Sequence, residues 1–251
     1  RLTEAGHQVT LYEAGPQAGG RCRSYDDDVL GCRIDNGNHL LLSGNTSAMA
    51  YLDLIGSADS LTGPGEAAFP FVDLASGERW TLRPGPGRIP FWLFDRSRRV
   101  LGTSVFDYST ALVLAAAGPH DTVADLIGGK ATLFRRFWEP FSVAVLNTEA
   151  ANGAAALMAP VLRETLFRGA AACRPLIARE GLSESFVDPA LAWLIARGAM
   201  IRTGTRVRAI TYDGRRATGL ELGSETISLA PGDSAVLAVP PGIAAELAKC
   251  D

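Results

Sequence analysis

The sequence predicts an α/β protein in which a strand-rich domain is interrupted by a mostly helical lobe. A short β-rich run occupies residues 7–13, and β-rich runs return after Pro175. Between them, residues 91–175 are rich in Ala, Leu and aromatic residues, with apolar residues at helical spacing. Because the strand-rich ends flank a helical middle, we expect a discontinuous domain of residues 1–62 and 176–251 and an inserted lobe of residues 63–175.

The first part of the chain predicts a helix end, a strand and a loop. Residues 1–6 are typical of the last turns of a helix that ends at a glycine, and residues 7–13 predict a strand. A Gly-rich loop over residues 14–25 follows. Apolar residues at helical spacing then predict a helix over residues 46–55.

The inserted lobe begins with Gly and Pro and continues with apolar helices. Alternation predicts short strands at residues 69–72 and 80–82. The uncharged window of residues 108–119 is shorter than the roughly 20 residues of a spanning helix, so it predicts a core helix or one that dips into a membrane. Arg96, Arg98 and Arg99 form a basic cluster that either contacts anionic lipid headgroups or is a solvated face.

The last part of the chain predicts a helix over residues 187–196 and a series of strands. The β-rich runs are residues 200–202, 206–212, 217–222, 226–229 and 235–239.

Composition and charge exclude several classes of protein. The 251 residues are 47% hydrophobic and 20% charged, which is typical of a globular protein. With 24 Lys and Arg against 27 Asp and Glu, the net charge of −3 argues against a nucleic-acid partner. The four cysteines (Cys22, Cys32, Cys173 and Cys250) have neither CxxC spacing nor histidine partners, so we expect no metal site, no disulfide framework and a cytoplasmic location.

A glutamate ends the first predicted strand. In a dinucleotide-binding βαβ unit, a carboxylate in the position of Glu13 accepts hydrogen bonds from the adenosine ribose hydroxyls. In the loop that follows, Gly19 and Gly20 permit close approach of a ligand, and Arg21 supplies a planar fork for a diphosphate. The alternative interpretation is a Gly-rich surface turn with a solvated arginine.

The run from Glu13 to Ser24 resembles the E-x-x-x-x-x-G-G-R-x-x-S/T signature of FAD-dependent amine oxidases, phytoene desaturases and their relatives. The resemblance implies a Rossmann-like FAD-binding domain of the glutathione-reductase-2 type. It also implies that Glu13 holds the adenosine ribose and that Gly19, Gly20 and Arg21 line the diphosphate and the flavin. FAD is therefore expected rather than NAD.

Residues 34–44 resemble the D-x-G-x-H strand that runs near the flavin ring in the same superfamily. The resemblance implies that Asp35 and Gly37 contact the cofactor. His39 is a candidate proton donor, because a histidine changes its charge near neutral pH. The alternative is that His39 satisfies backbone groups beside the cofactor without taking part in the chemistry.

Residues 137–148, FWEPFSVAVLNT, resemble the FWxP…LNT motif of one branch of this superfamily, the squalene-associated hydroxysqualene dehydroxylases of hopanoid biosynthesis. The resemblance continues through residues 161–164, 181–183, 188–190 and 198–202. It implies that Val207 lies against the adenine and that Pro240 ends a late strand near the cofactor. The alternative for Pro240 is a core strand that is stopped by proline. An apolar inserted lobe is then a substrate lobe for a long isoprenoid, with peripheral contact to the inner face of the cell membrane.

The resemblance implies reductive dehydroxylation of hydroxysqualene to squalene. A carotenoid-type desaturase and a flavin amine oxidase are the alternative enzymes. The chain begins with Arg1 and lacks the phosphate-binding GxGxxG before residues 7–13, so we expect a fragment that is truncated at both ends. A truncated module without catalytic activity is the alternative from another class.

Overall fold

The computed structural model describes residues 1–37, 39–129, 131–223 and 225–248, and the chain forms two compact units. Unit 1 comprises residues 1–38 and 180–251, and unit 2 comprises residues 39–179. The sequence pattern instead puts the boundaries after residues 62 and 175. The difference arises because two short strands near residues 41 and 61 both pair with a strand at residues 175–178.

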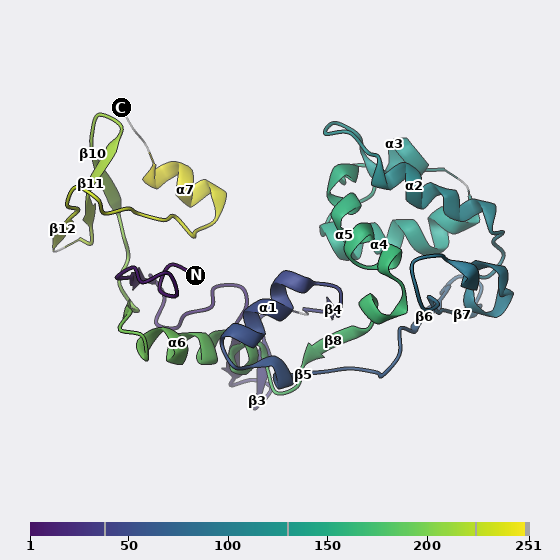
Figure 1. Ribbon diagram of the computed structural model, residues 1–251, viewed down its shortest axis with the longest axis horizontal. Coiled ribbons are helices and arrows are strands. Elements are labelled where there is room, and N and C mark those ends of the chain that lie inside the picture. The colour runs from purple at the N-terminus through teal and green to yellow at the C-terminus, as the bar shows by residue number, and fades with distance from the viewer. Residues whose placement is uncertain (38, 130, 224, 249–251) are drawn as a thin grey trace. The chain divides into compact units, whose positions relative to one another are not determined.

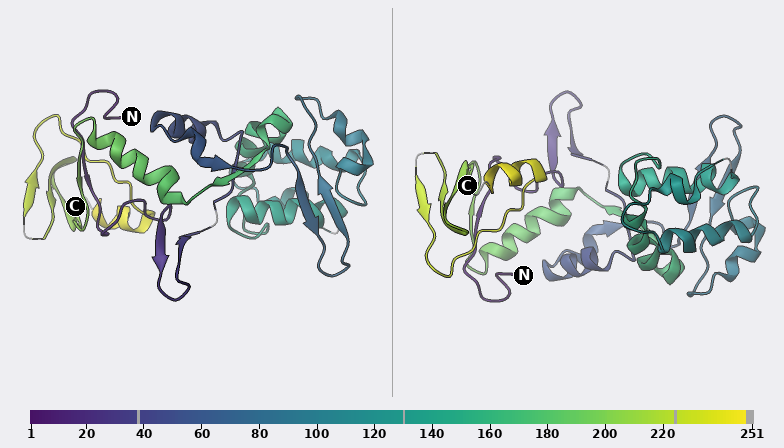
Figure 2. Two further views of the ribbon diagram at one scale, coloured as in Figure 1. Left: turned by 90° about the horizontal axis from the view of Figure 1, so that it is seen from below. Right: turned by 90° about the horizontal axis from the view of Figure 1, so that it is seen from above.

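Unit 1 contains a parallel strand pair, an antiparallel hairpin and a three-stranded antiparallel sheet (Figure 1). Its strands are β1 (Thr10–Tyr12), β2 (Ser24–Asp27), β3 (Cys32–Asp35), β9 (Met200–Arg202), β10 (Ala209–Asp213), β11 (Arg216–Glu221) and β12 (Thr226–Ser228). Its α-helices are α6 (Asp188–Ile195) and α7 (Pro241–Leu247). Figure 2 shows the β2–β3 hairpin in purple and the helix α6 in green.

The parallel pair carries the first predicted strand. Thr10 lies opposite Met200 and Tyr12 lies opposite Arg202, so β1 and β9 run in the same direction. The predicted strands near residues 7–13 and 200–202 are therefore confirmed, and they are neighbours in space.

The prediction of a strand at residues 235–239 is wrong. Residues 235–239 form no strand, and no backbone hydrogen bond joins them to another segment within residues 225–248 or the rest of the described chain. A strand exists only through a hydrogen-bonded neighbour, and the side chains of Val236 and Val239 are exposed. The helix α7 follows directly after Pro240.

Unit 2 combines short strands with helices. Its strands are β4 (Leu41–Leu42), β5 (Leu61–Thr62), β6 (Phe69–Val72), β7 (Arg79–Leu82) and β8 (Pro175–Ala178). Its α-helices are α1 (Thr46–Leu54), α2 (Thr110–Ala115), α3 (Val123–Ile127), α4 (Glu139–Leu146) and α5 (Met158–Glu164). Short 3₁₀ helices occupy Ala58–Ser60, Phe91–Phe94, Arg96–Arg98, Phe106–Ser109, Ala155–Leu157, Leu166–Arg168 and Ala170–Ala172.

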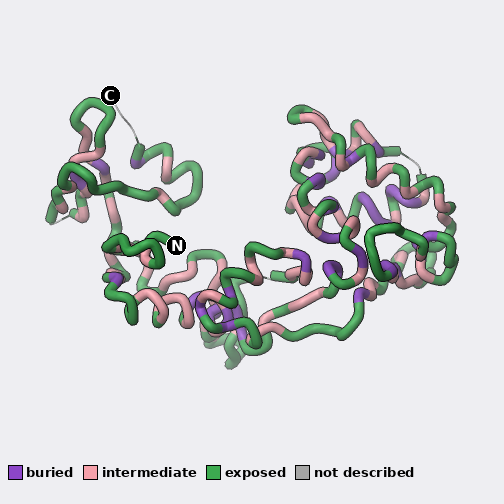
Figure 3. The backbone as a smooth tube through the Cα atoms, viewed as in Figure 1, coloured by how far each residue is buried: buried purple, intermediate pink, exposed green. Residues whose placement is uncertain are grey.

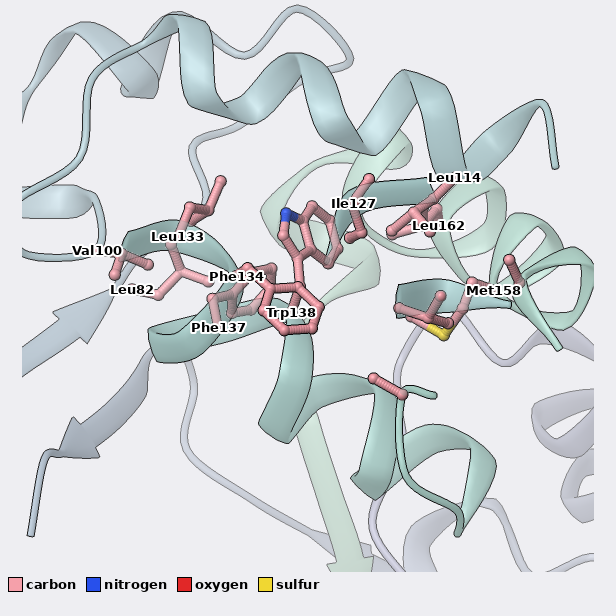
Figure 4. Close-up of a cluster of buried hydrophobic side chains, with 13 residues drawn as sticks. Leu82, Val100, Leu114, Ile127, Leu133, Phe134, Phe137, Trp138, Met158 and Leu162 are labelled. Atoms are coloured by element: carbon pink, nitrogen blue, oxygen red, sulfur yellow. The ribbon is translucent and has the colours of Figure 1, made fainter. Parts of the chain in front are cut away.

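The core of unit 2 is built around aromatic residues of the helical segment. Trp138 and Leu162 are completely or almost completely buried, and Phe137 packs against Trp138 with ring centroids 4.7 Å apart (Figure 4). The indole Nε1 of Trp138 donates a hydrogen bond of 2.8 Å to Thr110 Oγ1, which satisfies its polar atom. Most of the aromatic residues between 91 and 175 therefore serve the core.

Two helices contain a π-helical turn immediately before a proline. These turns are Phe134–Trp138, which leads into α4, and Ser183–Val187, which leads into α6. The N–H groups of Glu139 and Asp188 donate to carbonyls five residues back, and Pro140 and Pro189 follow. Each helix thus passes through its proline without a break.

Candidate functional site

Glu13 lies at the carboxyl end of β1. Its N–H donates to Arg202 O at 2.9 Å, and its carbonyl accepts from Thr205 N at 2.8 Å, so the ladder with the neighbouring segment continues past β1. The N–H of Gly15 donates to Glu13 Oε1 at 2.7 Å. Glu13 is half-buried. The hydrogen bond from Gly15 N holds its carboxylate in one orientation, at the edge of the sheet where α/β proteins bind nucleotide ligands.

The glycine turn, Gly19 and Gly20, follows six residues later. Its φ angles are 104° and 55°, which only glycine adopts readily. A Cβ at Gly19 would lie 2.8 Å from Cys22 O and 2.8 Å from Val187 Cγ2, whereas a Cβ at Gly20 would meet nothing within 4 Å. Packing inside unit 1 thus requires a glycine at position 19. The space beside Gly20 is open, so a ligand can approach the main chain there.

Two arginines flank this turn. Arg21 is exposed, and Arg23 is half-buried. The Nε of Arg23 is buried and has no hydrogen-bond partner among the described residues. A buried donor without a partner is costly, and an anionic ligand beside the glycine turn would satisfy it. The sequence pattern singles out Arg21 alone, and Arg23, two residues later, was missed.

Asp35 is already engaged inside unit 1. It lies opposite Ser24 in the β2–β3 hairpin, and its Oδ1 accepts from Ser24 Oγ at 2.6 Å and from Leu182 N at 2.9 Å. The N–H of Asn36 donates to Arg23 O at 2.9 Å, which ties the end of β3 to the arginine segment. Gly37 follows and is exposed.

The remaining predicted residues lie elsewhere. His39 is exposed and is the first residue of unit 2. Val207 is half-buried and precedes β10, which starts at Ala209 rather than at residue 206 as expected. Pro240 lies at the N-terminal end of α7.

The cysteines of the described chain are free thiols. Burial raises the pKa of the Cys22 thiol, and the carboxylate of Asp35 raises it further, so Cys22 stays neutral beside the glycine turn. Cys32 is exposed and Cys173 is buried, whereas Cys250 lies outside the described residues. Within the described ranges, no group of three or more His, Cys, Asp or Glu side chains could hold a metal ion.

The arrangement suits a nucleotide cofactor. A parallel strand pair ends in an oriented carboxylate, a turn with positive φ angles borders open space, and a buried guanidinium donor lacks a partner. Together these features are typical of an α/β protein, and they form a candidate site for an anionic dinucleotide. The chain belongs to the flavin containing amine oxidoreductase family, whose model matches residues 1–250. The family's cofactor is a flavin, in agreement with the FAD expected from the glycine-arginine signature.

Curated proteins that are similar to this chain include members of two groups of oxidoreductases. The chain is 47% identical over 248 residues to a hydroxysqualene dehydroxylase of Rhodopseudomonas palustris, and 42% identical over 247 residues to one of Sinorhizobium fredii. Each alignment covers 98% of this chain and 59% of the relative. A probable zeta-carotene desaturase of Synechococcus elongatus is 28% identical over 84% of this chain and 48% of the relative. The chain therefore spans about three-fifths of the length of its more similar relatives.

Solved structures support the fold. An oxidoreductase from Methanosarcina mazei matches with a TM-score of 0.63 at 16% identity, over 91% of this chain and 53% of that chain. A putrescine oxidase matches with a TM-score of 0.61, also at 16% identity, over 98% of this chain and 56% of that chain. The α/β flavoprotein fold predicted from the sequence is thereby confirmed.

Proposed function

We propose that the protein is an FAD-dependent oxidoreductase that converts hydroxysqualene to squalene. The observation that supports this most strongly is 42–47% identity to proteins named hydroxysqualene dehydroxylase over 95–98% of the chain. Identity to the zeta-carotene desaturase is 28%, which places a carotenoid-type desaturase second.

The residues of unit 1 fit FAD. Glu13, oriented by the N–H of Gly15, would accept hydrogen bonds from the adenosine ribose. The open side of Gly20 would leave room for the diphosphate, and the guanidinium groups of Arg21 and Arg23 would neutralise its charge. Glu13 would thus hold the ribose, and the arginines would hold the diphosphate.

Replacing the hydroxyl of hydroxysqualene by hydrogen is a two-electron reduction in which the hydroxyl is protonated and leaves as water. The cofactor, reduced by an electron donor, supplies the hydride for this exchange. His39 is the candidate from this chain for the protonation, because it is exposed and an imidazole side chain can serve as a general acid. Unit 2, with its large apolar content, is proposed to bind the isoprenoid chain.

Turnover tests the proposal directly. The protein, expressed from its complete gene, is incubated anaerobically with hydroxysqualene and a flavin reductant, and squalene is measured by mass spectrometry. We expect squalene, and a purified protein with the visible absorption of bound flavin. Turnover of phytoene without squalene formation would favour the desaturase, whereas a colourless protein that cannot be reconstituted with FAD would favour the module without catalytic activity.

An apolar segment of unit 2 supports contact with a membrane surface. Ile89, Phe91 and Phe94 have exposed side chains, and the exposed Arg88 and Arg96 lie beside them in the sequence. Apolar residues flanked by arginines suit the boundary between acyl chains and anionic headgroups. No helix in the described ranges is long and apolar enough to cross a bilayer.

The other two arginines of the predicted basic cluster do not belong to this surface. Arg98 Nε donates to Arg83 O at 3.2 Å, and Arg99 is buried. Flotation with phosphatidylglycerol vesicles tests the contact. We expect F91S/F94S to move the protein to the soluble fraction and L74S, at an exposed turn of the same unit, to leave it with the vesicles. Equal flotation of both variants would contradict membrane contact through residues 88–96.

A further inference from the structure

The β2–β3 hairpin is joined to the helix that contains α6 by a pair of reciprocal serine contacts. Ser24 N donates to Ser183 Oγ at 2.8 Å, and Ser183 N donates to Ser24 Oγ at 3.0 Å. Ser24 Oγ in turn donates to Asp35 Oδ1 at 2.6 Å. Asp35 Oδ1 also accepts from Leu182 N at 2.9 Å, so two N–H groups at the start of the helix have partners from the hairpin.

The two reciprocal serine contacts are buried and closely packed, whereas Asp35 is an exposed residue whose hydrogen bonds to Ser24 and Leu182 are partly buried. Ser24 is 2% exposed and Ser183 is 7% exposed. A Cβ at Gly181 would lie 2.7 Å from Ser24 Oγ, so the backbone of the helix start approaches the hairpin as closely as it can. On the outer side, Arg33 Nε contacts Glu184 Oε1 at 2.6 Å across the same junction. The burial is visible as a purple stretch at the start of this helix (Figure 3).

The same helical turn also supports the glycine turn. Gly19 approaches Val187 so closely that a Cβ at Gly19 would lie 2.8 Å from Val187 Cγ2. Ser183 and Val187 are the first and last residues of the π-helical turn. The π-helical turn therefore touches the chain on both sides of Arg21 and Arg23, at Gly19 and at Ser24.

We infer that Ser24, Asp35 and Ser183 form a positioning site that holds residues 19–24 in the shape that receives the FAD diphosphate. This inference rests on the proposed flavin site. Asp35 acts here as a hydrogen-bond acceptor for the helix start and for Ser24, and it contributes through the hairpin rather than by touching the cofactor. Without the reciprocal serine contact, Ser24 N–H loses its partner, and the helix holds the segment only at Gly19, while the hydrogen bond from Asn36 N to Arg23 O still ties the segment to β3.

A matched pair of hydroxyl deletions tests the inference. S183A removes the acceptor for Ser24 N, whereas S185A removes a hydroxyl that is also buried, two residues away, and has no hydrogen-bond partner in the described chain. The Kd of FAD is measured on the apoprotein from the complete gene by quenching of FAD fluorescence. We expect S183A to raise the Kd about tenfold, the equivalent of one lost buried hydrogen bond, and S185A to leave it unchanged.

A second pair separates positioning from direct contact. Asp35→Asn keeps an acceptor oxygen for Leu182 N and Ser24 Oγ, so it should bind FAD like the wild type, whereas Asp35→Ala should behave like S183A. The flavin absorption of the Asp35→Asn holoprotein should also be unchanged.

Several results would overturn the inference. An unchanged Kd in S183A, an equal loss in S185A, or a loss in Asp35→Asn as large as in Asp35→Ala would each do so. Failure of the wild type to bind FAD would overturn both the inference and the proposed function. A wild type that binds FAD but forms no squalene would refute the function alone and leave the positioning site standing.

Discussion

Gly20→Ala probes whether the open side of the glycine turn receives the cofactor. Gly20 has a φ of 55°, and an alanine Cβ there would meet nothing within 4 Å. The left-handed conformation costs a residue with a Cβ about 1–2 kcal/mol, partly offset by about 0.4–1 kcal/mol from the less flexible unfolded chain. We therefore expect the apoprotein to lose about 1 kcal/mol of unfolding free energy. The added methyl would displace a ligand that approaches the backbone closely.

The control is Gly31→Ala, in the turn of the β2–β3 hairpin. Gly31 has a φ of 62°, and a Cβ at this position would also meet nothing within 4 Å, so the cost in stability should be the same. Urea unfolding measures stability, and quenching of FAD fluorescence measures affinity. We expect Gly20→Ala to raise the Kd of FAD by roughly 10- to 100-fold, the value of one charge-assisted hydrogen bond, with no change in Gly31→Ala. Equal Kd values in the two variants would refute the placement of the diphosphate at Gly20.

Three further predictions concern unit 2 and the thiols. Leu162→Ala, at a side chain that is 0% exposed, should cost about 2–5 kcal/mol in urea unfolding, whereas Leu157→Ala at an exposed position should cost far less. Thr110→Val removes the acceptor of Trp138 Nε1 and should cost about 1–3 kcal/mol, and an unchanged melting curve would contradict that hydrogen bond. Burial raises the pKa of Cys173 to about 12, so iodoacetamide at pH 8 should label the exposed Cys32 and spare Cys173 in the native protein. The Cys173 thiol of the unfolded chain ionises at lower pH than the buried thiol. The contribution of Cys173 to the free energy of unfolding should therefore be lost as the pH rises from about 9 towards 12.

Sequence patterns predicted those helices and strands whose own residues show a helical or alternating spacing of apolar side chains. The helix over residues 46–55 appears as Thr46–Leu54, and the alternating runs near residues 69–72 and 80–82 form the hairpin of β6 and β7. The paired residues of β1 and β9 lie 190 positions apart in the sequence, but each strand was visible as a β-rich run. Glu13 and the glycine turn were found for the same reason, since a strand end and two glycines are local features.

Features that depend on distant partners escaped prediction. The β2–β3 hairpin was missed because its strands, SYDD and CRID, are mostly polar and lack an apolar alternation. The contacts of Asp35 to Leu182 and of Ser24 to Ser183 join residues 147 and 159 positions apart, and no local pattern reveals them. The strand expected at residues 235–239 failed for the opposite reason, because a β-rich run without a hydrogen-bonded neighbour is not a strand.

The two π-helical turns make helix length and proline content interdependent. A proline ring collides with the carbonyl four residues back in a regular α-helix, and the extra residue in each wide turn removes that collision for Pro140 and Pro189. Deleting one residue from either turn would restore the regular spacing and bring the ring back against the backbone. Family members that are one residue shorter at these helices should therefore also have lost the proline, so that the two changes are inherited together.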